Sequence, residues 1–178
     1  MKILFFGDIV GRPGREGVAK VLPKLKKKYN PDIVGANVEN LAHGHGITKE
    51  SLDEISAAGV DFFTSGNHVW EGRDSKSLLE DKKLPLVRPA NYPPKAPGKG
   101  FCILQVGTKR LLVINLMGRV FMKVQIDCPM RKADEIFFSL SKADDPAKDA
   151  LDWWCKFLIP RNDDPEGHLV VGWLVRHE

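Results

Sequence analysis

Short apolar runs alternate with longer amphipathic segments through the first half of the chain. The apolar runs end in glycine or polar residues, whereas the segments between them repeat hydrophobic residues at helical spacing. This alternation is typical of β-α-β units, in which helices connect parallel strands. We therefore predict an α/β fold with a mostly parallel sheet. The predicted strands span residues 2–6, 32–37, 60–65 and 84–88, and the predicted helices span residues 15–29, 48–58 and 73–80.

The pattern changes after residue 88. Residues 89–100 are rich in proline and glycine, which predicts an ordered loop or a joint between halves of the sheet. Beyond this segment, residues 101–106 and 110–116 are predicted to form an antiparallel hairpin, and a helix is expected over 131–142. Residues 149–178 show no clear periodicity, so we expect one domain over 1–148 and a separate segment over 149–178.

Composition limits the class of protein. The 178 residues are 43% hydrophobic and 28% charged, which is typical of a soluble globular domain that folds without disulfides or a structural metal. The net charge of +4 is modest, and the run KLKKK at 24–28 has the character of a solvated helix end. We predict no specific nucleic-acid partner.

Two further observations concern location. Cys102, Cys128 and Cys155 are widely spaced and contain no Cys-x-x-Cys pair, which favours a reducing compartment and argues against a cysteine zinc site. No stretch of 18 consecutive apolar residues occurs in the sequence. We expect a cytoplasmic protein with no membrane partner.

Polar side chains follow each of the first three predicted strands. Asp8 follows the first strand, Glu39 and Asn40 follow the second, and Asn67 and His68 follow the third. Ligands of open α/β sheets bind beyond the carboxyl ends of the strands, so these side chains should lie close together. Two carboxylates in a partly dry cleft repel unless a cation lies between them. Carboxylate, amide and imidazole groups together suit manganese, iron or zinc.

Each of these residues also has a simpler interpretation. Asp8 could cap the following helix, and Glu39 and Asn40 could occupy an ordinary turn. Asn67 could adopt a left-handed conformation beside a glycine, and His68 could simply be exposed.

Two neighbouring patterns, one of glycines and one of histidines, allow other interpretations. Gly7, Gly11 and Gly14 could belong to a Rossmann nucleotide loop, but their spacing is not G-x-G-x-x-G, and Asp8 would oppose a pyrophosphate. His43 and His45 in HGHG have metal-like spacing. Because glycines flank them, we expect a loop over the site and do not count these histidines as ligands.

The polar residues belong to a set of motifs that occur in a fixed order along the chain. Together these motifs closely resemble the YmdB-type metallophosphoesterases, a family described as 2',3'-cyclic-nucleotide 2'-phosphodiesterases. The resemblance runs from Met1 to about Lys148. The matching stretches are FGDIVGRPGR (6–15), ANVENLAHGHGIT (36–48), GNHVW (66–70), RPANYP (88–93), PGKG (97–100), VINLMGR (113–119) and CPMRKAD (128–134).

This resemblance implies a calcineurin-like phosphoesterase fold with two divalent or trivalent metal ions, usually iron or manganese. On the matching positions, Asp8, Glu39 and Asn67 would bind metal, and Asn40 would lie at the site and contact substrate. His68 would be the catalytic proton donor. The implied reaction is hydrolysis of a small phosphodiester or cyclic nucleotide. The sequence is also compatible with a homo-oligomer.

The resemblance ends near residue 148. The family completes its metal shell with three histidines in F-H-A-E and G-T-H-x-H motifs, which this sequence does not contain, and we assign no ligand role to His168 or His177. We expect a shortened or frame-altered family member with an incomplete site. The alternatives are a noncatalytic binding remnant of the fold and, third, a Rossmann-like nucleotide-binding protein.

Overall fold

The computed structural model describes residues 1–120, 122, 124–142, 155–157 and 168–174, with side chains described up to residue 140. These residues belong to two compact units. The first comprises Met1–Arg88 and Pro97–Lys99, and the second comprises Pro89–Ala96 and Gly100–Glu178. The boundary falls in the segment rich in proline and glycine, residues 89–100, where the sequence predicted a loop or a joint.

The first unit is built on a four-stranded parallel sheet in the order β1-β2-β3-β4. This arrangement confirms the predicted α/β fold class. The strands are β1 (Ile3–Asp8), β2 (Ile33–Asn37), β3 (Phe62–Thr64) and β4 (Leu86–Val87), and the helices are α1 (Gly11–Tyr29), α2 (Lys49–Ala57), the 3-10 helix η1 (Asn67–Glu71) and α3 (Ser75–Glu80).

Burial differs between the strands of this sheet. Every residue of β2 is buried, because β2 lies between β1 and β3. By contrast, β1 is an edge strand whose residues are exposed or half-buried. The apolar run at residues 2–6 predicted a strand, but a single run of apolar residues cannot show on how many sides that strand is covered.

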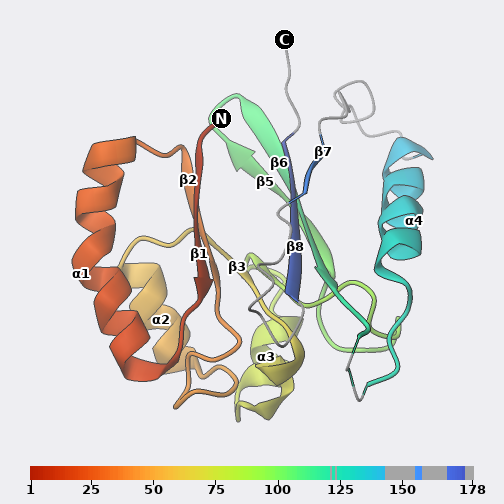
Figure 1. Ribbon diagram of the computed structural model, residues 1–178, viewed down its shortest axis with the longest axis horizontal. Helices are drawn as coiled ribbons and strands as arrows, with labels where there is room; N and C mark the ends of the chain where they lie inside the picture. The colour runs from red at the N-terminus through yellow and green to blue at the C-terminus, as the bar shows by residue number, and fades with distance from the viewer. Residues whose placement is uncertain (121, 123, 143–154, 158–167, 175–178) are drawn as a thin grey trace. The chain divides into compact units, whose positions relative to one another are not determined.

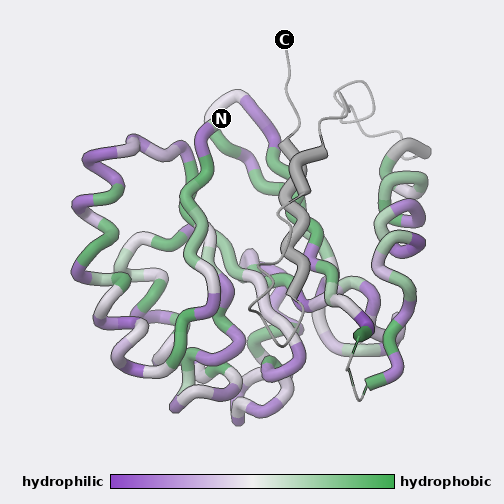
Figure 2. The backbone as a smooth tube through the Cα atoms, viewed as in Figure 1, coloured by the Kyte–Doolittle hydropathy of each residue, from purple (hydrophilic) through white to green (hydrophobic). Residues whose placement is uncertain are grey.

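The two long helices of this unit lie side by side (Figure 1). Val18 and Leu22 are buried on α1 four residues apart, so they lie on the same side of the helix. Hydrophilic and hydrophobic residues alternate along α1, as Figure 2 shows. Asn30 ends α1 in a left-handed conformation, and its N–H bonds to Lys26 O at 2.8 Å. In α2, Thr48 and Ser51 form a reciprocal capping box.

The described residues of the second unit form an antiparallel sheet in the order β5-β6-β8-β7 and one helix. The predicted hairpin is confirmed, since β5 and β6 pair in antiparallel register. Of the two alternatives for residues 89–100, the joint between halves of one sheet was wrong, because the described strands form two separate sheets. The elements are β5 (Phe101–Val106), β6 (Lys109–Met117), α4 (Pro129–Lys142), β7 (Cys155–Phe157) and β8 (His168–Leu174).

Asn91 joins three segments of the second unit. Its side-chain Nδ2 donates to Met117 O at 2.8 Å and to Asp127 O at 2.9 Å, and its Oδ1 accepts from Met117 N at 3.0 Å. Asn91 is fully buried, so these bonds replace water. This residue of the RPANYP motif therefore has a structural role in the fold. Among the described helices of the chain, none has the length and apolar character needed to cross a membrane.

Candidate functional site

Asp8 lies at the carboxyl end of β1, and its Oδ2 accepts a hydrogen bond of 2.8 Å from Asn40 Nδ2. In the sheet register, Asp8 is paired with Asn37 at the end of β2. The N-cap of α1 is Val10, and no side chain caps this helix. The alternative interpretation of Asp8 as a helix cap is therefore wrong. Asp8 is exposed and directed to the turn after β2.

Glu39 lies in that turn and is fully buried. Its Oε2 accepts from the backbone N–H of His68 at 2.9 Å, and its Oε1 accepts from Asn37 Nδ2 at 3.3 Å. The Glu39 N–H in turn bonds to Asn37 Oδ1 at 3.0 Å. A buried carboxylate is costly unless it is compensated by donors or by a cation. Glu39 therefore links the loop after β2 to η1 and offers negative charge in a place shielded from water.

The hydrogen bonds of the Asn40 side chain indicate whether a cation fits these residues. Its Nδ2 holds Asp8, but its Oδ1 is buried and has no hydrogen-bond partner in the described part of the chain. Such a buried unsatisfied acceptor is unusual and calls for an explanation such as an ion. Two carboxylates and an amide oxygen are hard oxygen donors. The residues present thus fit a divalent metal ion.

Asn67 and His68 occupy the first two positions of η1. Among the described residues, Asn30 and His43 are the non-glycine residues with positive φ, so Asn67 is not left-handed. The side chain of His68 retains 16% of its accessible surface, so the interpretation of a simply exposed histidine is wrong as well. Both residues lie half-buried next to the bond between the His68 backbone and Glu39.

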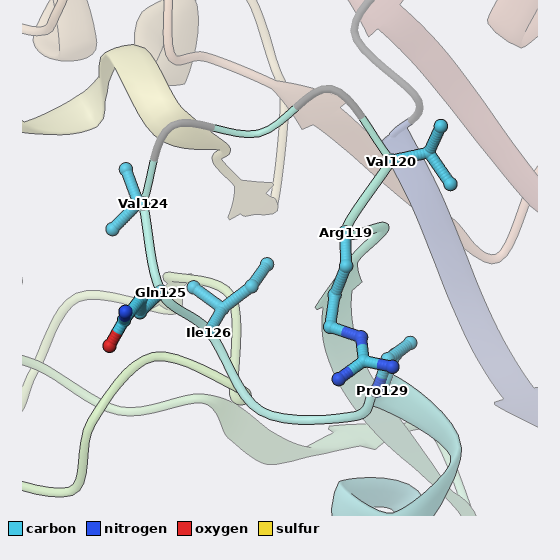
Figure 3. Close-up of a pocket in the computed structure, with 6 residues that line it drawn as sticks. All are labelled: Arg119, Val120, Val124, Gln125, Ile126 and Pro129. Carbon is cyan, nitrogen blue, oxygen red and sulfur yellow. The ribbon is translucent and has the colours of Figure 1, made fainter.

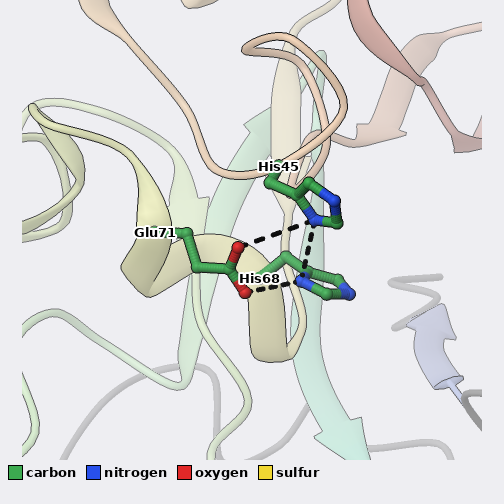
Figure 4. A group of neighbouring side chains, drawn as sticks. All are labelled: His45, His68 and Glu71. Atoms are coloured by element: carbon green, nitrogen blue, oxygen red, sulfur yellow. Dashed lines mark hydrogen bonds and ion pairs between the residues drawn. The ribbon is translucent and has the colours of Figure 1, made fainter.

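His68 also belongs to a cluster with Glu71 and His45 (Figure 4). The Nδ1 of His68 lies 2.7 Å from Glu71 Oε1 and 3.2 Å from the Nδ1 of His45. The second carboxylate oxygen, Glu71 Oε2, lies 3.6 Å from His45 Nδ1. His68 and Glu71 share one face because a 3-10 helix has three residues per turn.

Glycines position the loop that carries His45. Gly46 has a φ of +71°, and a Cβ atom built on it would lie 2.2 Å from the backbone N of Gly72. Gly72 follows η1 directly, and a Cβ built there would lie 2.1 Å from Ile47 O. The two chain segments touch backbone to backbone, which only glycine permits. The HGHG loop is thereby held against the end of η1.

Sequence reasoning did not identify Glu71 or the placement of His45. The spacing of His68 and Glu71 by three residues would have been a signal if η1 had been predicted, but no helix was expected there. The HGHG pattern by itself does not distinguish His43 from His45. In the structure, His45 Nδ1 lies 3.2 Å from His68 Nδ1, in a loop that the contact between Gly46 and Gly72 holds in place.

A cavity of about 440 Å³ lies beside this cluster, and His45 and Glu71 contribute to its lining. Its two arginines are paired, since Arg15 Nε lies 2.6 Å from Glu54 Oε2 and Arg73 bonds to Glu50 Oε1 at 2.8 Å. Hydrogen bonds from its own backbone N–H and from Thr48 keep the pKa of the Glu50 carboxyl below its ordinary range. The lining residues are Arg15, Ala42, His43, His45, Thr48, Glu50, Ser51, Glu54, Glu71, Gly72 and Arg73.

A second cavity, of about 710 Å³, lies in the second unit at the start of α4 (Figure 3). Its described lining includes a single ionisable side chain, Arg119, and offers no carboxylate or imidazole as a metal ligand. It is therefore not a candidate metal centre. The lining residues are Arg119, Val120, Val124, Gln125, Ile126 and Pro129.

Solved structures share this α/β architecture. A hypothetical protein from Thermus thermophilus matches with a TM-score of 0.72 and 43% identity, over 78% of this chain and 53% of that chain. A novel phosphatase from Mycoplasma pneumoniae matches with a TM-score of 0.72 and 30% identity, over 78% of this chain and 51% of that chain. The predicted phosphoesterase type of α/β fold is thus confirmed.

Sequence relatives define the family. The model of the YmdB-like proteins matches residues 4–149. The chain is 44% identical over 142 residues to the 2',3'-cyclic-nucleotide 2'-phosphodiesterase of Bacillus subtilis (strain 168), which covers 80% of this chain and 53% of that protein. A putative phosphatase/phosphodiesterase of Mycoplasma pneumoniae is 33% identical over 122 residues, covering 66% of this chain and 43% of that protein.

This chain therefore belongs to the YmdB-like family. The resemblance predicted from the sequence motifs is confirmed, and the Rossmann-like interpretation is set aside. The chain spans about half the length of the relatives it matches.

Proposed function

We propose that this chain carries the strand-end residues of a metal-dependent phosphodiesterase that hydrolyses 2',3'-cyclic nucleotides or related small phosphodiesters. The observation that carries the proposal is the pairing of Asp8 with Asn40, next to a fully buried Glu39. The Bacillus subtilis relative is named for this reaction. The proposed domain covers residues 1–148, with 149–178 as a separate segment.

The metal ligands in this proposal are Asp8, Glu39 and Asn67. Asn40 contributes its buried Oδ1, which has no partner among the described residues. It would face either an ion or the substrate. Two ions are proposed, with iron or manganese favoured because most of the donors are oxygens. When bound, such ions act as Lewis acids that activate water and offset the charge of a phosphodiester.

His68 is proposed as the proton donor to the leaving ribose oxygen. Its Nδ1 lies 2.7 Å from Glu71 Oε1, so Nδ1–H of the protonated ring can donate a hydrogen bond to Glu71 while Nε2–H is given to the leaving oxygen. The backbone bond from His68 N to Glu39 Oε2 ties the position of this imidazole to the proposed metal ligands. Glu71 is thus a positioning residue. A histidine held in this way can contribute about 10²- to 10⁴-fold to the rate.

A cytoplasmic location and an organic phosphodiester partner complete the proposal. Cys102 and Cys128 are not disulfide-bonded, which is consistent with a reducing compartment. Whether copies of the chain associate is a separate question that sedimentation can answer.

The proposal is tested by metal analysis and by hydrolysis of 2',3'-cyclic AMP with added Mn²⁺. Asp8→Asn and Glu39→Gln should each lower the bound manganese and the activity, since each removes a charge while keeping the shape of the side chain. Asp53→Asn is the matched control, because Asp53 lies on the exposed surface of α2 in an ion pair with Lys49. Equal metal content in all three variants and the parent protein would contradict the assignment. Metal binding without turnover would favour the noncatalytic alternative.

A further inference from the structure

We propose that His45, His68 and Glu71 form a separate binding site for a zinc-class metal ion. The three side chains come from two segments, the HGHG loop and η1, and their potential ligand atoms lie within 4.8 Å of one another. Neither Asp8 nor Glu39 takes part in this site. Its ligand set therefore differs from that of the proposed phosphodiesterase centre, although His68 belongs to both.

The distances between the ligand atoms fit tetrahedral zinc. Zinc binds imidazole nitrogen and carboxylate oxygen at about 2.0–2.2 Å, which places ligand atoms of a tetrahedron about 3.3 Å apart. The distances found here are 3.2 Å between the two Nδ1 atoms, 2.7 Å from His68 Nδ1 to Glu71 Oε1, and 3.6 Å from His45 Nδ1 to Glu71 Oε2. The last two distances end on different carboxylate oxygens, so a rotation of the Glu71 side chain would turn one oxygen toward both nitrogens. The fourth position is left to solvent.

The arrangement of the donor atoms supports the same conclusion. The two Nδ1 atoms face each other at 3.2 Å. A cation placed among them and the Glu71 carboxylate would be bound by two imidazole nitrogens and one negative charge together.

The site is held in shape before any metal binds. His68 and Glu71 lie on the same side of η1 because this helix has three residues per turn, and the His68 backbone N–H donates a hydrogen bond to Glu39. The close contact of Gly46 with Gly72 places His45 opposite them. His45 and Glu71 retain 62% and 50% of their side-chain surface, so an ion can reach the site from solvent.

The donor set distinguishes this site from the proposed catalytic centre. Two imidazoles with one carboxylate favour zinc over manganese or magnesium, whereas the carboxylates and amide oxygens near Asp8 are harder ligands. A metal at His68 Nδ1 would take the place of the proton that an imidazolium carries there. A metal ion at this site and the doubly protonated form of His68 therefore exclude each other. The effect of this exclusion on catalysis rests on the proposed function, whereas the metal site itself does not.

The experiment uses the chelator-stripped chain titrated with Co²⁺, whose tetrahedral complexes absorb visible light strongly, followed by displacement with Zn²⁺. We expect one tetrahedral Co²⁺ signal per chain that zinc abolishes. His45→Ala and Glu71→Gln should each weaken binding by at least about 10- to 100-fold, the loss caused by changing even residues that support a ligand. His43→Asn is the matched control in the same loop, since asparagine tolerates the φ of +52° found at His43.

Nitrogen NMR of the histidine rings gives a second measurement. Zinc should shift the Nδ1 resonances of His45 and His68 while leaving that of His43 unchanged. The Asp8→Asn/Glu39→Gln double variant should retain both the cobalt signal and these shifts. A signal lost in that double variant but kept in His45→Ala would overturn the proposal, as would the absence of tetrahedral Co²⁺ from the parent protein. If the Asp8 and Glu39 variants keep the cobalt signal and also bind as much manganese as the parent protein, only the proposed function is refuted.

Discussion

The side-chain amide of Asn40 donates a hydrogen bond of 2.8 Å to the Asp8 carboxylate, although 32 residues separate them in the chain. The bond connects the end of β1 to the turn after β2. It also leaves the Asn40 oxygen buried and without a partner among the described residues. One side chain therefore both positions a carboxylate and presents an acceptor, and this dual role can be tested directly.

Changing Asn40 to aspartate should destabilise the metal-free protein. The variant Asn40→Asp loses the donor to Asp8 and brings two carboxylates together, which should cost about 1–3 kcal/mol in the free energy of unfolding. Mn²⁺ should restore part of this loss, because a cation relieves the repulsion. The measurement is urea unfolding with and without Mn²⁺. The exchanged pair, Asp8→Asn with Asn40→Asp, recreates one donor and one acceptor and should recover most of the stability; failure to do so would mean that the hydrogen bond is not what matters.

Replacing His68 should affect substrates according to their leaving groups. His68→Ala should slow hydrolysis of 2',3'-cyclic AMP by about 10²- to 10⁴-fold, since the ribose alkoxide needs a proton. Hydrolysis of bis(p-nitrophenyl) phosphate should fall far less, because p-nitrophenolate leaves without protonation. Steady-state rates on both substrates with Mn²⁺ measure this difference. Similar losses on the two substrates would indicate that His68 binds phosphate or metal.

Adding a methyl group at Gly46 should loosen the loop that carries His45. Gly46→Ala places a Cβ atom 2.2 Å from Gly72 N at a residue with φ of +71°, and should cost about 1–3 kcal/mol in unfolding free energy. Gly17→Ala is the matched control, since nothing lies within 4 Å of a Cβ built at Gly17 in α1. This control should gain up to about 1 kcal/mol from helix propensity. Denaturant unfolding of the two variants should therefore show effects of opposite sign.

Truncating Asn91 should destabilise the second unit. Asn91→Ala removes three hydrogen bonds and leaves the buried N–H and C=O of Met117 unpaired. We expect a loss of about 2–4 kcal/mol in unfolding free energy. Asn30→Ala, at the exposed end of α1, serves for comparison and should cost less. An Asn91→Ala protein as stable as the parent would show that water replaces these bonds.

Cys128 should react with alkylating reagents at lower pH than an ordinary cysteine. Hydrogen bonds from the backbone N–H of Arg131 and then Met130 lower the pKa of the Cys128 thiol. A lowered pKa means that the reactive thiolate is populated at a pH where an ordinary cysteine is still protonated. The alkylation rate by iodoacetamide, followed against pH by mass spectrometry, should rise and level off below the pH range of a model cysteine peptide. Cys128→Ser should abolish this fast reaction, and an unshifted profile would refute the prediction.

The sequence by itself was sufficient for the class of fold and for the family. Apolar runs alternating with amphipathic segments predicted the parallel sheet and its helices, because strand and helix periodicities are local properties of the chain. The ordered motifs from Met1 to about Lys148 predicted the YmdB-like family, which the match over residues 4–149 confirms. Five polar residues were selected because each follows a strand, and described hydrogen bonds join four of them in two pairs, Asp8 with Asn40 and Glu39 with His68.

The tertiary structure decided what local pattern cannot express. Helix α1 begins at Gly11, whereas the sequence pattern predicted a start at residue 15. The helix starts earlier because it follows β1 closely, and the N–H of its first residue, Gly11, bonds to Asn40 O. Glu71 joins His68 only because the chain forms a 3-10 turn after β3, a short element with no periodicity of its own. His45 reaches them only because Gly46 and Gly72 allow two backbones to touch. Contacts between residues distant in sequence depend on how the backbone folds back on itself, and a linear pattern of residue types does not contain that information.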